Sequence, residues 1–180
     1  FHGFSYNFIK KLEKYALYHG NLSVAENINS VCFLINNVFS DLKIPFVIAG
    51  NNADNKIKKL IERYSNITLI DSPSKNKLDK LIHQARVHIL PTFQSTGMKL
   101  KLIHVLFTNG AIIINSNMIT DSELTQCCII ADTAQDMKNY VIKFCNENIK
   151  KEVLELRKKI IEKKFSNKKN GNELIKYIYK

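Results

Sequence analysis

The sequence lacks several features that would assign a function at once. None of its apolar runs approaches the roughly 20 residues that a membrane-spanning helix needs. Its first residues, Phe1 to Lys11, show no charged start followed by a long apolar stretch, so no secretory signal peptide is evident. The chain begins with Phe instead of Met, and we expect it to be a piece of a longer protein.

Metal-binding and common nucleotide-binding motifs are missing too. The four cysteines and five histidines form no C-x-x-C pair, no zinc-type spacing and no H-E-x-x-H. We therefore expect no metal site and no cofactor, and this use of cysteine favours a reducing, cytoplasmic compartment. The absence of G-x-G-x-x-G after the first strand, of G-x-x-x-x-G-K-[ST] and of G-x-S-x-G argues against dehydrogenases, P-loop enzymes and α/β-hydrolases.

Positive charge is in excess, and most of the excess is C-terminal. The net charge is +11, and residues 138–180 carry 13 Lys or Arg against 5 Asp or Glu. Such a bias indicates an anionic partner: a nucleic acid, an anionic membrane surface or a phosphorylated ligand. The alternative is that the lysines only solvate helices.

Short apolar runs alternate with helical patterns along most of the chain. Strands apolar on both faces, separated by helices of about 10–14 residues, indicate a parallel sheet covered on both sides. We therefore predict one α/β domain, a doubly wound Rossmann-like sheet of about six strands in the order 3-2-1-4-5-6. The predicted strands are 15–19, 45–49, 67–70, 87–90, 111–115 and 128–131, and the predicted helices are 26–39, 54–64, 75–85, 98–107 and 133–146.

The C-terminal segment reads as a helical tail. Residues 148–180 form a basic amphipathic pattern that is broken between Phe165 and Gly171 and ends in a second short helix. The first helix of this tail is expected to bury one stripe, made of Ile149, Val153, Leu156 and Ile160.

Ligands of open parallel sheets bind beyond the carboxyl ends of the strands. The predicted loops there are rich in glycine, which lets a ligand approach the backbone, and in small polar side chains, which supply hydrogen bonds. Ordinary turns share this composition. The candidate binding residues in the first three loops are Gly20, Asn21, Gly50, Asn51, Ser72 and Ser74.

The loop after the fourth predicted strand leads into a helix that starts near Gly97. Backbone N–H groups at Thr96, Gly97 and Met98, together with the helix dipole, suit an anion such as a pyrophosphate. Helical spacing places Lys101 and His104 on one face, within reach of a phosphate and a ribose hydroxyl. The alternative is that Lys101 extends along the surface and His104 packs against the sheet.

Four segments carry a family resemblance, in order and at plausible spacing. Residues 15–27, 46–50, 89–92 and 97–102 resemble the C-terminal domain of GT-B glycosyltransferases, of the glycosyltransferase family 4 or group 1 type. The resemblance implies a domain that binds a nucleotide-diphosphate sugar for transfer, as a hexosyl or related sugar, to a glycan or lipid-linked acceptor in polysaccharide biosynthesis. It also implies that a separate N-terminal, acceptor-binding domain is missing, and that the protein is cytoplasmic, peripheral at the inner face of the membrane.

Several positions depart from the family pattern. Asn21 and Glu26 stand where many members have an Arg and a Lys that grip the donor diphosphate. Thr96 and His104 stand where the family has two glutamates, while Lys99 and Lys101 match basic positions of one variant and would supply the diphosphate charge. No catalytic residue is assigned, and we expect the isolated domain to be inactive. A nucleic-acid-binding module and a degenerate, non-catalytic transferase-like domain are the alternatives.

Overall fold

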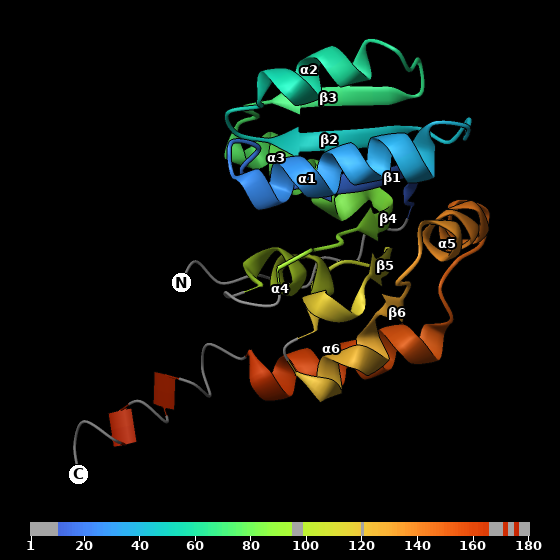
Figure 1. Ribbon diagram of the computed structural model, residues 1–180. Helices are drawn as coiled ribbons and strands as arrows, with labels where there is room; N and C mark the ends of the chain where they lie inside the picture. The colour runs from blue at the N-terminus through green and yellow to red at the C-terminus, as the bar shows by residue number, and fades with distance from the viewer. Residues whose placement is uncertain (1–10, 95–98, 120, 166–170, 173–174, 177–180) are drawn as a thin grey trace.

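The computed structural model describes residues 11–94, 99–119, 121–165, 171–172 and 175–176. They form one parallel sheet of six strands, ordered β3-β2-β1-β4-β5-β6, with helices on both faces (Figure 1). This confirms the predicted α/β class, strand number and strand order. The strands are β1 (Glu13–His19), β2 (Phe46–Gly50), β3 (Ile67–Asp71), β4 (Ala85–Ile89), β5 (Ala111–Ile114) and β6 (Ile129–Ile130).

The sheet forms because its central strands are apolar on both faces. All four residues of β5 are buried, as are the last four residues of β1. The register places Ala16 opposite Phe46, and Phe46 opposite Ile67. Every pairing is parallel, so the carboxyl ends of the strands lie at one edge.

The helices cover the two faces in the way that right-handed crossovers require. Figure 1 shows α1 in front of the sheet and α3 behind it. Helix α5 packs against β1 and β4, and α4 lies beside α3, where His104 approaches Asp79. The helices are α1 (Ala25–Leu34), a π-helix that continues it (Ile35–Phe39), α2 (Asn55–Ile61), α3 (Lys75–Gln84), α4 (Leu100–Leu106), α5 (Ala134–Asn146) and α6 (Lys151–Lys164).

The second half of the chain departs from the prediction in two places. The sixth strand is only two residues long, because the chain before it winds into 3-10 turns at Ser116–Met118 and Ser122–Cys127. Helix α6 begins after Ile149, and its buried positions are Arg157, Ile160 and Ile161. The predicted stripe was therefore only partly right, because Val153 and Leu156 are half-buried.

No helix in the described part of the chain is long and apolar enough to cross a membrane.

Candidate ligand site at the carboxyl edge of the sheet

Hydrogen bonds join the loops that follow the first three strands. The Leu22 N–H donates to the Asn51 carbonyl at 2.8 Å, and the Ser72 N–H donates to the Gly50 carbonyl at 2.7 Å. Ser72 adopts a positive φ of 53°, and its hydroxyl donates to Asp71. Ser74 caps α3 by accepting from the Lys77 N–H. The predicted residues of these loops thus lie along one edge, and several of their polar groups are engaged in turns and caps.

The glycines at this edge allow two strand ends to approach each other closely. A Cβ atom on Gly50 would lie 1.7 Å from the Gly20 carbonyl oxygen, so no other residue fits there without a backbone shift. A Cβ on Gly20 would lie 3.2 Å from the Asn27 side chain. Gly50 therefore has a packing role whatever ligand the edge takes, while a side chain at Gly20 would have to displace the Asn27 amide by a few tenths of an ångström.

Asn21 and Asn27 organise the turn between β1 and α1. The Asn21 side chain accepts from the N–H and the hydroxyl of Ser23, at 3.1 and 2.9 Å. Asn27 donates through Nδ2 to the Asn21 carbonyl at 2.8 Å. This leaves Asn27 Oδ1 as an acceptor directed to its other side.

The ammonium of Lys101 reaches this turn from α4. Lys101 Nζ lies 2.9 Å from both the Tyr18 hydroxyl and Asn27 Oδ1, and it sits 4.8 Å from the centre of the Tyr18 ring. Tyr18 in turn donates to Asn27 Oδ1 at 2.9 Å, and burial raises the pKa of Tyr18 well above its usual value. The three side chains form a triangle at the end of β1.

The surroundings of Lys101 disfavour its charge. Burial lowers the pKa of Lys101 to about 8; the Glu26 carboxylate opposes this shift and the Lys99 ammonium adds to it. Among the described residues, no carboxylate forms an ion pair with Lys101. A largely desolvated ammonium held by two neutral oxygens is a place where an anion gains electrostatic energy.

Glu26, which stands where the family has a lysine, turns toward the loop after β4. Its Oε1 accepts from the Thr92 hydroxyl at 2.5 Å and from the Phe93 N–H at 2.8 Å. Asn115, the residue that follows β5, holds the same loop, since it exchanges two hydrogen bonds with the Thr92 backbone, at 3.0 and 2.7 Å. The loop that precedes α4 is thus fixed from two sides.

Lys99 and His104 flank Lys101 in the sequence, and the structure gives each of them different partners. Lys99 is buried and donates to the Gln94 carbonyl at 2.8 Å. His104 Nε2 lies 3.6 Å from Asp79, and its ring meets the ring of His19 edge-on at 5.7 Å. Lys101 and His104 therefore both contact the end of β1. The predicted residues Thr96, Gly97 and Met98 lie outside the described residues.

A cluster of buried histidines stays neutral beneath this edge. Burial lowers the pKa of His19 to about 3, with smaller contributions from His104 and Lys101. Burial also lowers the pKa of His88, whose Nε2 lies 3.0 Å from the Thr108 hydroxyl. Within the described ranges, no group of three or more His, Cys, Asp or Glu side chains is placed to hold a metal ion.

Comparison with known proteins identifies the fold. The sequence matches no protein-family model and no curated protein sequence. Solved structures do match: TarM from S. aureus, in a complex that contains UDP, superposes with a TM-score of 0.69 at 15% identity, over 94% of this chain and 36% of that one. The chain has the fold of a GT-B C-terminal domain.

Two further glycosyltransferase structures support this assignment of the fold. AviGT4, a glycosyltransferase of avilamycin A biosynthesis, has a TM-score of 0.55 at 10% identity, over 85% of this chain and 51% of that one. A UDP-forming trehalose-phosphate synthase from Burkholderia xenovorans has a TM-score of 0.54 at 11% identity, over 82% and 39%. The chain thus spans between about a third and a half of the length of these proteins.

Sequence reasoning missed two members of the Lys101 triangle. The sequence identifies Tyr18 only as a strand residue. A polar side chain near the end of a buried strand nevertheless indicates a residue at the carboxyl edge of the sheet. Asn27 is the last residue of the segment 15–27 that resembles the family, and the sequence alone assigns it no role. Its position as the third residue of α1 is the available signal, because a side chain in the first turn of a helix can reach back to the loop before it.

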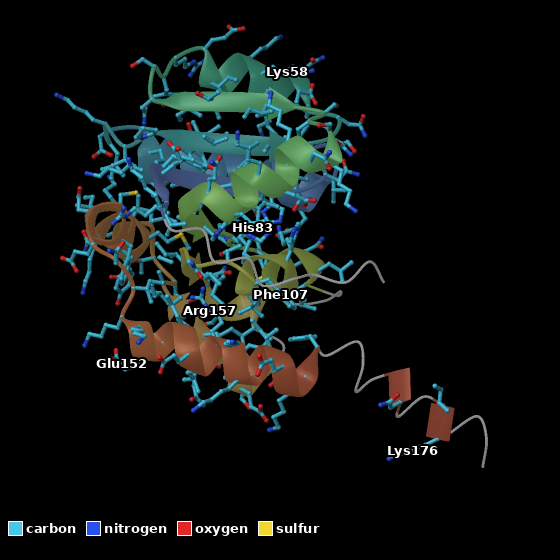
Figure 2. All side chains as sticks on the ribbon, turned by 180° about the vertical axis from the view of Figure 1, so that it is seen from behind. Lys58, His83, Phe107, Glu152, Arg157 and Lys176 are labelled. Atoms are coloured by element: carbon cyan, nitrogen blue, oxygen red, sulfur yellow. The ribbon has the colours of Figure 1, made fainter. Side chains whose placement is uncertain are left out.

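Arg157 was missed for a different reason. It is fully buried, and it donates to the carbonyls of Thr108, Gly110 and Cys127 at 2.9, 3.0 and 3.1 Å. Figure 2 shows it on the side of α6 that faces the body of the domain. An arginine in a basic amphipathic helix is normally assigned to the solvent face, so the residue type gave no indication that Arg157 is buried.

Proposed function

We propose that this chain is the donor-binding domain of a glycosyltransferase. It would hold a nucleotide-diphosphate sugar at the carboxyl edge of its sheet for transfer to a glycan or lipid-linked acceptor, and a separate N-terminal domain would supply the acceptor site. The fold supports this proposal, and so do the names of the structural neighbours, which include a UDP complex and a UDP-forming enzyme.

One observation carries the proposal: the ammonium of Lys101 is largely desolvated, lies at the strand edge and contacts only neutral oxygens in the described chain. A diphosphate beside it would receive a charge-assisted hydrogen bond and restore the ordinary pKa of the lysine. We place the diphosphate beside Lys101 and Lys99; Thr96, Gly97 and Met98, which the sequence predicts to contact it, lie outside the described residues. His104 would then lie toward the ribose.

The nucleic-acid alternative gains no support from residues 138–165, the part of the C-terminal region that the structure describes continuously. Binding of single strands needs aromatic side chains free to stack on bases. Tyr140, Phe144 and Phe165 pack against the hydrophobic core instead. The exposed positions of α6 also carry both signs of charge, as in the Lys151–Glu155 and Lys158–Glu162 pairs.

Titration calorimetry with UDP, GDP, ADP, CDP and dTDP tests the proposal. We expect at least one nucleotide to bind, and Lys101→Met to weaken its binding about ten- to a hundredfold, which corresponds to roughly 1.5–3 kcal/mol. Lys59→Met, which removes the same charge from an exposed site on α2, is the matched control and should bind as the parent chain does.

The pH dependence sharpens this test. Because Lys101 must be protonated to attract the diphosphate, affinity should fall as pH rises above about 8, by up to about tenfold per pH unit. Lys101→Met should bind weakly without that decline. If no nucleotide binds at millimolar concentration, or if Lys101→Met keeps the parental affinity and pH profile, the proposed site is wrong.

The proposal has two further parts, the lack of sugar transfer by this chain alone and the place of the protein in the cell. We expect the chain alone to bind a donor without transferring sugar, since transfer requires donor and acceptor to be held together. We place the domain in the cytoplasm, with its basic C-terminal segment at an anionic membrane surface. The composition of residues 138–180 supports that placement.

A further inference from the structure

A cleft lies at the amino ends of β2 and β3, on the opposite side of the sheet from the candidate donor site. It has a volume of about 650 Å³, within the range of ligand sites, and it is formed by the two loops that precede these strands. In Figure 1 these loops lie at the tail ends of the β2 and β3 arrows. The five residues of β2 separate the cleft from the candidate donor site by about 16 Å.

The frame of this cleft is held in place by contacts from its own loops and from α5. Asn66 donates to the Phe39 carbonyl at 3.1 Å and to the Ile44 carbonyl at 3.5 Å, which ties the two loops together. Phe39 stacks on Phe46 at 4.0 Å beneath them. Both carboxylate oxygens of Asp41 meet the Lys138 ammonium, at 2.8 and 2.9 Å. The cleft is therefore largely formed without a ligand.

Apart from Asn66 and Asp41, the polar side chains that line the cleft have no partner in the described part of the protein. Among the described residues, no side-chain hydrogen bond or ion pair engages any of six lining residues. They are four hydroxyl residues and two cations: Ser40, Tyr64, Ser65, Thr68, Lys43 and Arg63. Because Lys138 already neutralises Asp41, the charge that faces the cleft is positive.

The combination of groups identifies a class of ligand. Hydroxyl side chains can both donate to and accept from sugar hydroxyls, and Tyr64 and Pro45 add apolar surface for a ring face. Arg63 offers a planar pair of donors for a carboxylate, sulfate or phosphate, and Lys43 adds a second charge. We propose that this cleft binds a saccharide unit that carries a negatively charged group, separately from the donor site.

Calorimetry with a short oligogalacturonate tests the proposal, with its neutral methyl ester as the comparison, at about 0.15 M salt where non-specific attraction is screened. We expect the acidic oligosaccharide to bind, and Arg63→Gln and Lys43→Gln each to weaken binding about tenfold. Lys59→Gln removes an equal charge from exposed α2 and should change affinity by less than about twofold.

Further titrations show whether the saccharide binds in this cleft. Lys101→Met should leave oligogalacturonate binding unchanged, so failure of the donor-site proposal would not affect this one. Four outcomes would overturn it: no binding, equal binding of the methyl ester, equal losses in Arg63→Gln and Lys59→Gln, or a DNA oligonucleotide that displaces the saccharide at equal concentration. Inorganic sulfate that binds as tightly, with the same dependence on Arg63, would identify an anion site and overturn the saccharide assignment.

Discussion

Lys101 and Arg157 are two cations that lie partly or wholly inside the domain, and they are held in different ways. Arg157 is fully buried, and its guanidinium donates to three backbone carbonyls. Lys101 is half-buried and contacts the Tyr18 hydroxyl and Asn27 Oδ1, which are already bonded to each other. Without Arg157 the three carbonyls would lose their side-chain donor, whereas without Lys101 the Tyr18 hydroxyl would still donate to Asn27 Oδ1.

This difference separates a cation that holds the fold from one that is available to a ligand. The carbonyls that Arg157 satisfies belong to the chain between α4 and β5 and to the end of a 3-10 turn, so the arginine joins α6 to that part of the domain. Lys101 lies at the strand edge, where the loops after β1 and β4 meet. Substitution of Arg157 should therefore lower the stability of the fold, and substitution of Lys101 should weaken ligand binding.

The largest expected effect is on folding, at Arg157. Arg157→Met leaves three buried carbonyls without a donor, and we expect it to lower the free energy of unfolding by about 3–5 kcal/mol. Urea unfolding followed by circular dichroism measures this, since the chain has no tryptophan to report by fluorescence. Lys159→Met, at an exposed position of the same helix, should cost less than about 0.5 kcal/mol.

Arg157→Lys provides a second, milder variant. Lysine keeps the charge but has a single nitrogen for three carbonyls. We therefore expect the free energy of unfolding of Arg157→Lys to lie between those of the parent chain and Arg157→Met. If Arg157→Met is as stable as Lys159→Met, the guanidinium is not what anchors α6, and the contrast with Lys101 fails.

An intermediate effect is expected at His19, which contacts the same edge but carries no charge when folded. Its pKa is about 3 in the folded chain and near 6.5 in the unfolded chain, so the unfolded state binds more protons below pH 6.5. Stability should therefore be fully present above about pH 6.5 and fall as the pH decreases toward 3. At pH 5 this histidine alone should account for a loss of about 2 kcal/mol.

Unfolding of the parent chain and of His19→Asn and His19→Phe, each at pH 7.5 and at pH 5, measures this contribution. Both variants remove the titrating group, so the acid loss should be about 2 kcal/mol smaller in each, whatever the substitution costs at pH 7.5. An acid loss as large as that of the parent would show that His19 is not buried in its neutral form.

The fold was largely predictable from local patterns. The strands from Tyr15–His19 to Ala111–Asn115 are short and apolar on both faces, and their alternation with helical patterns is typical of parallel sheets covered by helices. The sixth strand was overestimated, since only Ile129 and Ile130 form it, although Cys128 and Ala131 on either side are also apolar and at least partly buried. In such a short segment, a residue that is buried and a residue that pairs in a strand give the same apolar sequence pattern.

The candidate site was predictable in its location and less so in its contacts. Loop composition and helical spacing placed Lys101 and His104 at the carboxyl edge, where the structure has them. The partners of Lys101 were not predictable, because Tyr18 and Asn27 are 83 and 74 residues away and meet it only through the sheet order. The turn of Glu26 toward Thr92 is likewise a tertiary contact that no local pattern encodes.

The smallest expected effect is the stability change of Lys101→Met, and it decides whether the two cations differ as argued. The substitution removes a desolvated charge and adds apolar surface against the Tyr18 ring, while the Tyr18 hydroxyl still donates to Asn27 Oδ1. No buried acceptor is left without a donor, so the free energy of unfolding should change by less than about 1 kcal/mol, in either direction. The same urea experiment at pH 7 measures it beside Arg157→Met. A loss of about 3 kcal/mol or more would mean that Lys101, like Arg157, is held for the fold, and the main physical reason for placing an anion beside it would be gone.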